Sequence, residues 1–328
     1  MKKLFTLLLA LAASVGTLFA QSGTCGNNLT WDLTDGVLTI SGTGDMTNWF
    51  ANSNAPWYSY REEITDVIID NGVTTIGSYA FYNCTSLTSV SIPNSVFLIE
   101  INAFLGCSSL TSVTLNSSSI TSEGYGWNSN LGTIFGGNVT EFIIGDSVTA
   151  IGSNAFNYCT SLTSVTIGNS VTSIGRWAFE NCTGLTSIEI PNSVTTIGGS
   201  AFNNCTSLTS VTIGNSVTSI EQLAFISCSG LTSITCNAVV PPICGGYVFY
   251  GVDKSIPLYV PDNSVEAYQS ADGWREFYNI IGQSNAPTAI EEVNTTTNLN
   301  CSRKLLQDGQ ILILRGEKTY SLTGAEVK

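Results

Sequence analysis

A repeat of 23 residues is the feature of this chain that most limits how it can fold. Six copies match the pattern A-F-x-x-C-x-x-L-x-x-V/I-x-I/L/C. Their cysteines, each three residues after a phenylalanine and three before a leucine, are Cys84, Cys107, Cys159, Cys182, Cys205 and Cys228. Repeats of roughly 20 to 50 residues indicate a solenoid, because one repeat alone cannot bury its apolar face.

The V-x-I part of each repeat predicts a short strand, because alternate residues of a strand point to the same side. The turn residues P-N-S or G-N-S that follow end the strand. Stacked strands then form a parallel sheet with a spacing of about 4.8 Å. The nine predicted strands have the inward-pointing pairs Val67/Ile69, Val90/Ile92, Val113/Leu115, Phe142/Ile144, Val165/Ile167, Ile188/Ile190, Val211/Ile213, Ile234/Cys236 and Leu258/Val260.

One unit breaks the repeat. From Leu115 to Ile144 the chain takes 29 residues, six more than the period, and the extra segment SSSITSEGYGWNSNLGTIFGGN has no matching cysteine. Tyr125 and Trp127 lie there among glycines, and exposed aromatic side chains are common anchors for binding. The alternative is that Trp127 folds back onto the repeats and fills an irregularity of the core.

The ends of a solenoid need caps, because an open end exposes core side chains. At the N-terminal end, NLTWDLTDGVLTISGTGD predicts a β-hairpin that turns at Asp35-Gly36. At the C-terminal end, VEAYQSADGW predicts a short helix after Ser264, a residue suited to the N-cap position. These segments assign residues 21–66 to an N-terminal cap, 67–257 to the repeats and 258–283 to a C-terminal cap.

These motifs resemble those of BspA-type leucine-rich repeat surface proteins. The resemblance rests on the A-F-x-x-C-x-x-L-x-x-V-x-I period, the GNNLTWDLTDGVLTISGTGDM opening and the PPIC…LYVPDNSVEAY…GW ending, and it covers about residues 23–282. It implies a leucine-rich-repeat horseshoe, mainly β with short helical turns, that is secreted and displayed on a surface for adhesion. It transfers no ligand and no fixed functional residues.

The charge of the chain narrows its possible partners. Between Gln21 and Gln283 there are four basic and nineteen acidic residues, a net charge of −15. Such a body repels phosphate backbones and anionic lipid, so neither nucleic acid nor membrane insertion is expected. We expect a monomer that binds an extracellular protein or a glycan.

No catalytic, metal or cofactor site is expected. The chain has no histidine, and a nucleophilic cysteine needs a nearby base or positive charge. The repeated cysteines lie 23 residues apart, whereas zinc ligands cluster in C-x-x-C pairs. Hydrolysis would need paired carboxylates, for which Glu62-Glu63 and Asp66/Asp70 are the weak candidates. We therefore expect a binding protein and not an enzyme.

The repeated cysteines occur in phase with the core phenylalanine and leucine, which predicts a ladder of buried free thiols. Disulfides between neighbouring turns are the alternative. Outside the ladder, a disulfide between Cys236 and Cys244 could close a loop around Pro241-Pro242. Otherwise Cys236 is another core residue and Cys244 belongs to the cap.

The residues that flank the inward-pointing pairs face outward and form a broad surface, which we call the hydroxyl ribbon. Solenoids use such extended faces for binding. The simpler interpretation is that serine and threonine are soluble residues that suit strands. The hydroxyl ribbon comprises Ser89, Ser91, Ser112, Thr114, Ser164, Thr166, Ser187, Glu189, Ser210, Thr212, Ser233 and Thr235.

Both ends of the chain carry sequences typical of export. Residues 1–20, MKKLFTLLLALAASVGTLFA, predict a secretory signal peptide, and the polar residues 284–300 indicate a linker. In residues 301–328 the run DGQILILRGEKTY resembles a C-terminal sorting tail of the type IX secretion system. This resemblance implies a Gram-negative bacterium and an extracellular or outer-membrane location. A small β-appendage without a sorting role is the alternative.

Overall fold

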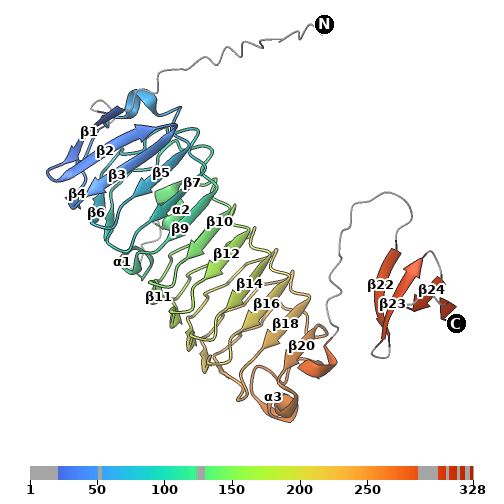
Figure 1. Cartoon of the computed structure of the whole chain (residues 1–328). Helices are drawn as coiled ribbons and strands as arrows, with labels where there is room; N and C mark the ends of the chain where they lie inside the picture. Colours follow the sequence, from blue (N-terminus) through green and yellow to red (C-terminus); the bar gives the residue numbers. More distant parts are fainter. Residues whose placement is uncertain are drawn as a thin grey trace, which may run out of the picture. The chain divides into compact units, whose positions relative to one another are not determined.

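The structure, a computed structural model, describes residues 21–50, 54–122, 124 and 130–286 and four strands between 302 and 327. The chain divides into two units, Met1–Gln283 and Ser284–Lys328. The first is a β-solenoid and the second is a small antiparallel sheet (Figure 1). The predicted solenoid, mainly β with a 23-residue repeat, is confirmed.

One strand from each repeat builds the front face of the solenoid. All nine predicted inward-pointing pairs are found on these strands, and every member is buried. β21 (Asn279–Gly282) adds a last strand at the C-terminal end. The front strands are β5 (Asp66–Ile69), β7 (Ser89–Ile92), β9 (Ser112–Leu115), β10 (Glu141–Ile144), β12 (Ser164–Ile167), β14 (Ser187–Ile190), β16 (Ser210–Ile213), β18 (Ser233–Cys236) and β20 (Pro257–Val260).

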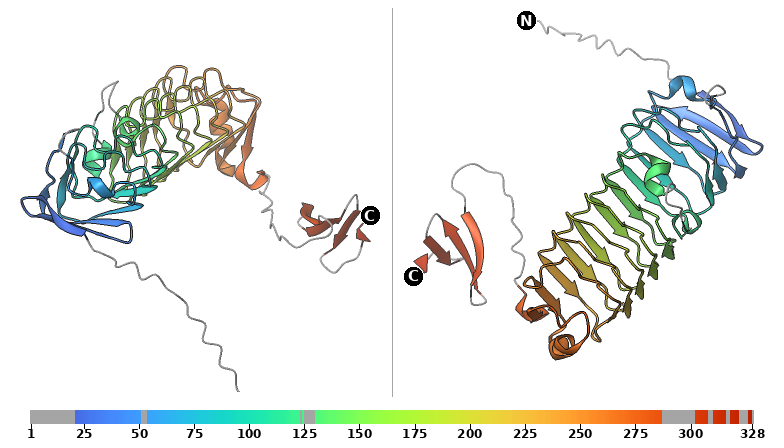
Figure 2. Two further views of the ribbon diagram at one scale, coloured as in Figure 1. Left: turned by 90° about the horizontal axis from the view of Figure 1, so that it is seen from above. Right: turned by 180° about the vertical axis from the view of Figure 1, so that it is seen from behind.

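Shorter strands form the back of the solenoid, and the turns stack regularly from one repeat to the next (Figure 2). Most of them come from the V-x-x-I segment of a repeat, whose first and last residues, such as Val171 and Ile174, are buried. The strand Gly44–Asp45 belongs to the N-terminal cap, and in the strand Ile243–Cys244 the isoleucine is exposed. One back sheet contains β4 (Gly44–Asp45), β6 (Val73–Ile76) and β8 (Leu98–Ile99). The other contains β11 (Ala150–Ile151), β13 (Ser173–Ile174), β15 (Thr196–Ile197), β17 (Ser219–Ile220) and β19 (Ile243–Cys244).

The A-F-x-x-C segment forms the third side of each turn. In four repeats the amide N–H of its phenylalanine donates to an alanine carbonyl of the next repeat, as from Phe179 to Ala201 at 2.7 Å. Two residues around that phenylalanine, Trp177 and Asn181, have positive φ angles of 57° and 59°. Left-handed residues bend the chain sharply, and Phe179 between them is fully buried.

A stack of phenylalanine rings fills the core. Successive ring centroids from Phe156 to Phe225 are 4.9, 5.1 and 5.0 Å apart, and the rings are within 5° of parallel. Burial of each such side chain stabilises the fold by about 1.5–3 kcal/mol. The exact repeat length is what places equivalent rings above one another.

The N-terminal cap is an antiparallel meander of β1 (Gln21–Gly26), β2 (Leu29–Thr34) and β3 (Val37–Gly42), and β3 pairs in parallel with β5. Asp35 and Gly36 between β2 and β3 both have positive φ, 52° and 82°, as a type I′ turn requires. The short helix η1 (Tyr58–Tyr60) follows. Trp57 is fully buried and its ring stacks on Phe81 at 6.0 Å, which closes this end of the core.

The C-terminal cap consists of η2 (Asp262–Ser264), α3 (Val265–Ser270) and the loop that follows. The helix is shorter than predicted, and the Ser264 side chain makes no capping hydrogen bond. Its hydroxyl donates instead to the carbonyl of Val239 at 2.7 Å, which ties the cap to the last repeat. Tyr268 and Trp274 are fully buried and close this end. The short helix η3 (Gln283–Asn285) begins at the last residue of the solenoid unit.

The long unit between β9 and β10 adds α1 (Ser118–Ser122) and α2 (Leu131–Phe135). The two front strands still pair in full register, from Ser112 opposite Glu141 to Leu115 opposite Ile144. The six extra residues therefore leave the front sheet unchanged. Phe135 lies 4.9 Å from Phe104 and continues the ring stack in place of an A-F-x-x-C phenylalanine.

The C-terminal unit is a four-stranded antiparallel sheet in chain order. Its strands are β22 (Ser302–Gln307), β23 (Gln310–Arg315), β24 (Lys318–Ser321) and β25 (Glu326–Val327). These strands fall within the segment predicted as a β tail.

Candidate binding site

The hydroxyl ribbon lies on the outward side of the front strands. Along each strand its residues alternate with buried ones, as the two-residue period of a strand requires. All twelve residues are exposed or partly exposed. The structure therefore brings the predicted ribbon residues together on one face, from β7 to β18.

The outward positions of β5 to β20 include three carboxylates and no lysine or arginine. The carboxylates belong to Asp66, Glu141 and Glu189. Glu141 accepts a hydrogen bond from the Ser112 hydroxyl at 2.8 Å, and Glu189 is exposed. Sequence reasoning left Asp66 and Glu141 out of the ribbon, although both flank predicted inward-pointing pairs. The face is therefore hydroxyl-rich and acidic.

The hydrogen-bond ladders between front strands are not all equal. Seven junctions, from β3–β5 to β20–β21, have four residue pairs each. The junctions β5–β7 and β18–β20 have only two pairs, and no ladder joins β12 to β14 in the described part of the chain. At each of these three junctions the later strand is followed by a proline: Pro93, Pro191 or Pro261.

Proline accounts for one missing hydrogen bond at each of these junctions, because it has no N–H to donate. At four of the complete junctions the residue after the strand closes the ladder, as from Gly145 N–H to the Leu115 carbonyl and from Asn237 N–H to the Ile213 carbonyl, both at 2.9 Å. Pro191 cannot give the corresponding bond to the carbonyl of Ile167. The segments P-N-S and G-N-S, which sequence reasoning treated alike as turns, therefore differ in what they do to the sheet.

A groove opens where no strand ladder joins β12 to β14. It has a volume of about 340 Å³ and follows the carboxyl ends of β12, β14 and β16; we call it the strand-end groove. Val165 and Ile167 on its wall are each 8% exposed, the highest values among the inward-pointing pairs. Glu189 is the one charged residue of the lining, which comprises Val165, Thr166, Ile167, Asn169, Glu189, Ile190, Pro191, Asn192, Thr212 and Asn237.

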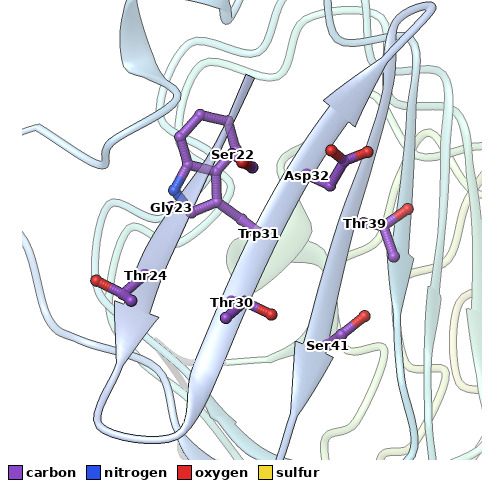
Figure 3. Close-up of a pocket in the computed structure, with 8 residues that line it drawn as sticks. All are labelled: Ser22, Gly23, Thr24, Thr30, Trp31, Asp32, Thr39 and Ser41. Atoms are coloured by element: carbon purple, nitrogen blue, oxygen red, sulfur yellow. The ribbon is translucent and has the colours of Figure 1, made fainter. Parts of the chain in front are cut away.

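A second hollow, of about 420 Å³, lies on the N-terminal meander (Figure 3). Hydroxyl groups from all three strands surround it, among them those of Ser22, Thr30 and Thr39. The Trp31 indole lies against Gly23, where a Cβ atom would come within 2.8 Å of Nε1. Trp31 is buried and its ring packs against Trp57 at 5.8 Å, so it serves the cap.

The repeated cysteines are buried free thiols. Four of them donate from Sγ to the carbonyl of the phenylalanine 26 residues earlier, at 3.0–3.2 Å; they are Cys107, Cys182, Cys205 and Cys228. Burial raises the pKa of Cys107 and of Cys159 to about 12. Such thiols stay protonated and are poor nucleophiles. Their hydrogen bond to the preceding turn was not anticipated from the sequence.

The disulfide considered for Cys236 and Cys244 is absent, because both cysteines are free. Cys236 lies on β18 of the front sheet, whereas Cys244 lies on β19 of the back sheet. The Tyr268 hydroxyl lies 3.1 Å from Cys236 Sγ, to which it donates a hydrogen bond. The two thiols therefore belong to different faces of the last turn.

The remaining candidates are not gathered into a site. Tyr125 and Trp127 lie outside the described residues. Glu62 forms an ion pair with Arg61 at 2.9 Å, and Asp66 and Asp70 flank opposite ends of β5. Within the described residues, no group of three or more His, Cys, Asp or Glu side chains could hold a metal ion. No helix in the same residues is long and apolar enough to cross a membrane.

Known proteins match the repeats and the fold. The model of the family described as BspA type leucine rich repeat region (6 copies) matches residues 54–135 and 135–255. No curated protein matches the chain.

Several solved structures of leucine-rich repeat proteins are similar. One from Bacteroides ovatus is 19% identical, with 79% of this chain and 88% of that chain covered and a TM-score of 0.36. A leucine rich cell surface protein from Faecalibacterium prausnitzii is 23% identical, with 80% and 95% covered and a TM-score of 0.34. The T. pallidum leucine rich repeat protein is 23% identical, with 71% and 86% covered and a TM-score of 0.33.

Proposed function

The chain belongs to the BspA-type leucine-rich repeat family, and from this premise we propose that it is a non-catalytic surface protein that binds an extracellular protein. The observation that carries the proposal is the hydroxyl ribbon, a continuous outward face without any basic residue. Nine strands spaced about 4.8 Å apart give this face a length of roughly 40 Å. A face of that length can accommodate a macromolecular partner.

The chemistry of the ribbon suits a polar contact. Each serine or threonine hydroxyl can donate and accept hydrogen bonds, so the face can match many partner surfaces. The parallel ladders hold these side chains in fixed rows, which lowers the entropy lost on binding. The net charge of −15 between Gln21 and Gln283 favours encounters with basic partners.

Export to the cell surface is part of the proposal. It is supported by the family, by the signal-peptide pattern of residues 1–20 and by the resemblance of residues 301–328 to a sorting tail. We propose that the mature protein is a monomer, divided into the caps, repeats, linker and tail predicted above. Fractionation of cells that express the full chain or a chain lacking residues 301–328 tests the role of the tail.

The alternative function is a glycan-binding module that uses Tyr125 and Trp127. It rests on the sequence of the long unit, since both residues lie outside the described part of the chain. The experiment that separates the two functions presents the purified full chain to arrays of extracellular-matrix proteins and of glycans. A ribbon variant, Thr212→Arg, and the double variant Tyr125→Ala/Trp127→Ala are tested beside it.

Protein binding that is lost in Thr212→Arg and kept in the double variant supports the ribbon. Sugar binding that is lost only in the double variant moves the function to the long unit. The absence of binding on both arrays contradicts the proposed function.

A further inference from the structure

We infer that the strand-end groove receives a basic side chain, lysine or arginine, from an extended segment of the bound protein. The inference rests on the proposed function, because it names the chemistry of the partner at one point of the front face. Three observations carry it: the missing ladder between β12 and β14, the position of Glu189 and the absence of basic residues at the outward positions of these strands.

The first observation supplies a hydrogen-bond acceptor. Pro191 has no N–H, so it cannot bond the Ile167 carbonyl as Gly145 bonds the Leu115 carbonyl at the β9–β10 junction. Ile167 belongs to the wall of the groove. A carbonyl with a free lone pair at such a place favours a ligand that donates hydrogen bonds, because an unmet acceptor costs free energy.

The second observation supplies the charge. Glu189 is the one charged residue of the lining, it is exposed, and no ion pair of this residue is found among the described residues. Lysine and arginine have only donors and carry a full positive charge. Their hydrogen bonds to a carboxylate are charge-assisted and about twice as strong as neutral ones.

The lining also argues against other classes of ligand. None of the ten lining residues is aromatic, so a sugar ring would find no flat partner on which to stack. An anionic ligand would meet Glu189 without a compensating positive charge on the neighbouring strands. The wall has only a few apolar side chains beside threonine, asparagine and glutamate, which suits a polar group.

The chain contains its own control for this geometry at the junction of β5 and β7. Pro93 follows β7 as Pro191 follows β14, and the β5–β7 ladder is shortened to two pairs. At the positions equivalent to Thr166 and Glu189, however, the β5–β7 junction has Ile68 and Ser91. The same backbone defect without a carboxylate is therefore available for comparison.

The test uses the full chain and two fluorescein-labelled peptides, one of alternating glycine and arginine and one of alternating glycine and glutamate. Binding is measured by fluorescence anisotropy at about 0.15 M salt, where surface attraction beyond roughly 8 Å is screened. The variants are Glu189→Gln, which removes the charge, and Pro191→Gly, which restores the N–H that can close the ladder. Their matched controls are Glu266→Gln on α3 and Pro93→Gly.

We expect the arginine peptide to bind and the glutamate peptide not to bind. Glu189→Gln and Pro191→Gly should each weaken binding about tenfold or more, as expected for a lost charge-assisted hydrogen bond. Both controls should stay within about twofold of the unchanged chain. Thermal melting monitored by circular dichroism checks that each variant is folded. Glu189 is exposed, so Glu189→Gln tests the inference even if Pro191→Gly alters the packing around it.

Other outcomes separate this inference from the proposed function. Equal weakening by Glu189→Gln and Glu266→Gln shows diffuse attraction and overturns the inference, while protein binding remains. Failure of the arginine peptide to bind, together with binding on the matrix-protein array, also overturns the inference alone. Failure on both the peptides and the arrays contradicts the proposed function itself.

Discussion

The repeats from Phe156 to Phe225 and the long unit between Leu115 and Ile144 fill the same core in different ways. In the regular repeats the rings are within 5° of parallel. Through the long unit the angles between successive rings are 39°, 68° and 64°, as Phe135 and Phe142 join the stack. The comparison teaches that a constant period aligns the core, whereas an insertion disturbs the core and leaves the front sheet in register.

The long unit compensates for its lost motif with specific contacts. The Asn130 side chain caps α2 by accepting the Thr133 N–H at 2.9 Å, and the Leu131 N–H donates to the Ala155 carbonyl at 2.8 Å. The second bond continues the backbone pairing that an A-F-x-x-C turn would make. At Gly132 an added Cβ would come within 2.6 Å of Cys159 Sγ, so this glycine makes room for the first thiol of the regular stack.

The largest effect is expected in the middle of the regular stack. Phe179→Ala should lower the free energy of unfolding by about 3–5 kcal/mol, because the back ladders β11–β13 and β13–β15 hold the neighbouring turns and hinder collapse of the cavity. Phe135→Ala should cost less, since α2 lies in an insertion that can shift. Urea unfolding measures both, with Phe97→Ala at an exposed position as the control. Equal losses of unfolding free energy in Phe179→Ala and Phe135→Ala would mean that the core of the long unit is as rigid as that of the regular repeats.

The contact between the two regions gives the next effect. Gly132→Ala should destabilise the protein by about 1–3 kcal/mol through overpacking against Cys159. Adding Cys159→Ala should recover part of that loss, which a double-mutant cycle in urea would show as coupling. Gly137→Ala is the control, because nothing lies within 4 Å of a Cβ atom there. Additive effects of the two substitutions would mean that the thiol does not need this space.

The thiol ladder predicts a dependence of stability on pH. Burial raises the pKa of Cys159 from 9.0 to about 12, and that of Cys182 well above 9.0, so these thiols ionise in the unfolded chain before they do in the folded one. Their contribution to stability is complete below pH 9 and is lost as the pH rises from about 9 to 12. The loss is at most about 1.4 kcal/mol per thiol and pH unit.

Urea unfolding at several pH values under reducing conditions measures this slope. In Cys182→Ser the slope should be smaller, because serine does not titrate in this range. An unchanged slope would mean that the thiols do not govern alkaline stability.

The smallest effect concerns the edge of the front sheet. Thr186 donates from Oγ1 to the Thr163 carbonyl at 3.3 Å, and Thr140 donates to Thr111 across the long unit, also at 3.3 Å. Thr186→Val and Thr140→Val should therefore each cost about 0.5 kcal/mol. Equal decreases of the melting temperature would agree with a front sheet that the insertion leaves unchanged. An unchanged melting temperature in Thr140→Val would contradict that interpretation.

Much of the fold could be predicted because its signals are local. The pairs such as Val165/Ile167 repeat every 23 residues with a period of two, and this pattern leaves one strand assignment. The inward phase of Cys182 likewise predicted its burial. What the sequence could not show is that its thiol donates to Phe156, because that contact joins two turns of the solenoid.

The same distinction holds for the candidate site. The hydroxyl ribbon follows from strand phase, so its residues could be named in advance. The strand-end groove brings Pro191 next to β12, more than twenty residues earlier in the chain, and this contact exists only after the strands align. The sequence does contain a relevant feature, because proline replaces glycine or asparagine after three of the strands. Its link to incomplete ladders becomes visible only when the residue pairs at each junction are compared.

The proline after β14 also has a mechanical consequence. Each turn of a solenoid contacts mainly its two neighbours, so tension between the two ends passes through every junction in series. At β12–β14 the front ladder is missing, yet behind it β13 and β15 remain paired from Ser173 opposite Thr196 to Ile174 opposite Ile197. Under load we therefore expect this junction to yield first on its front side, while its back side holds the two halves together.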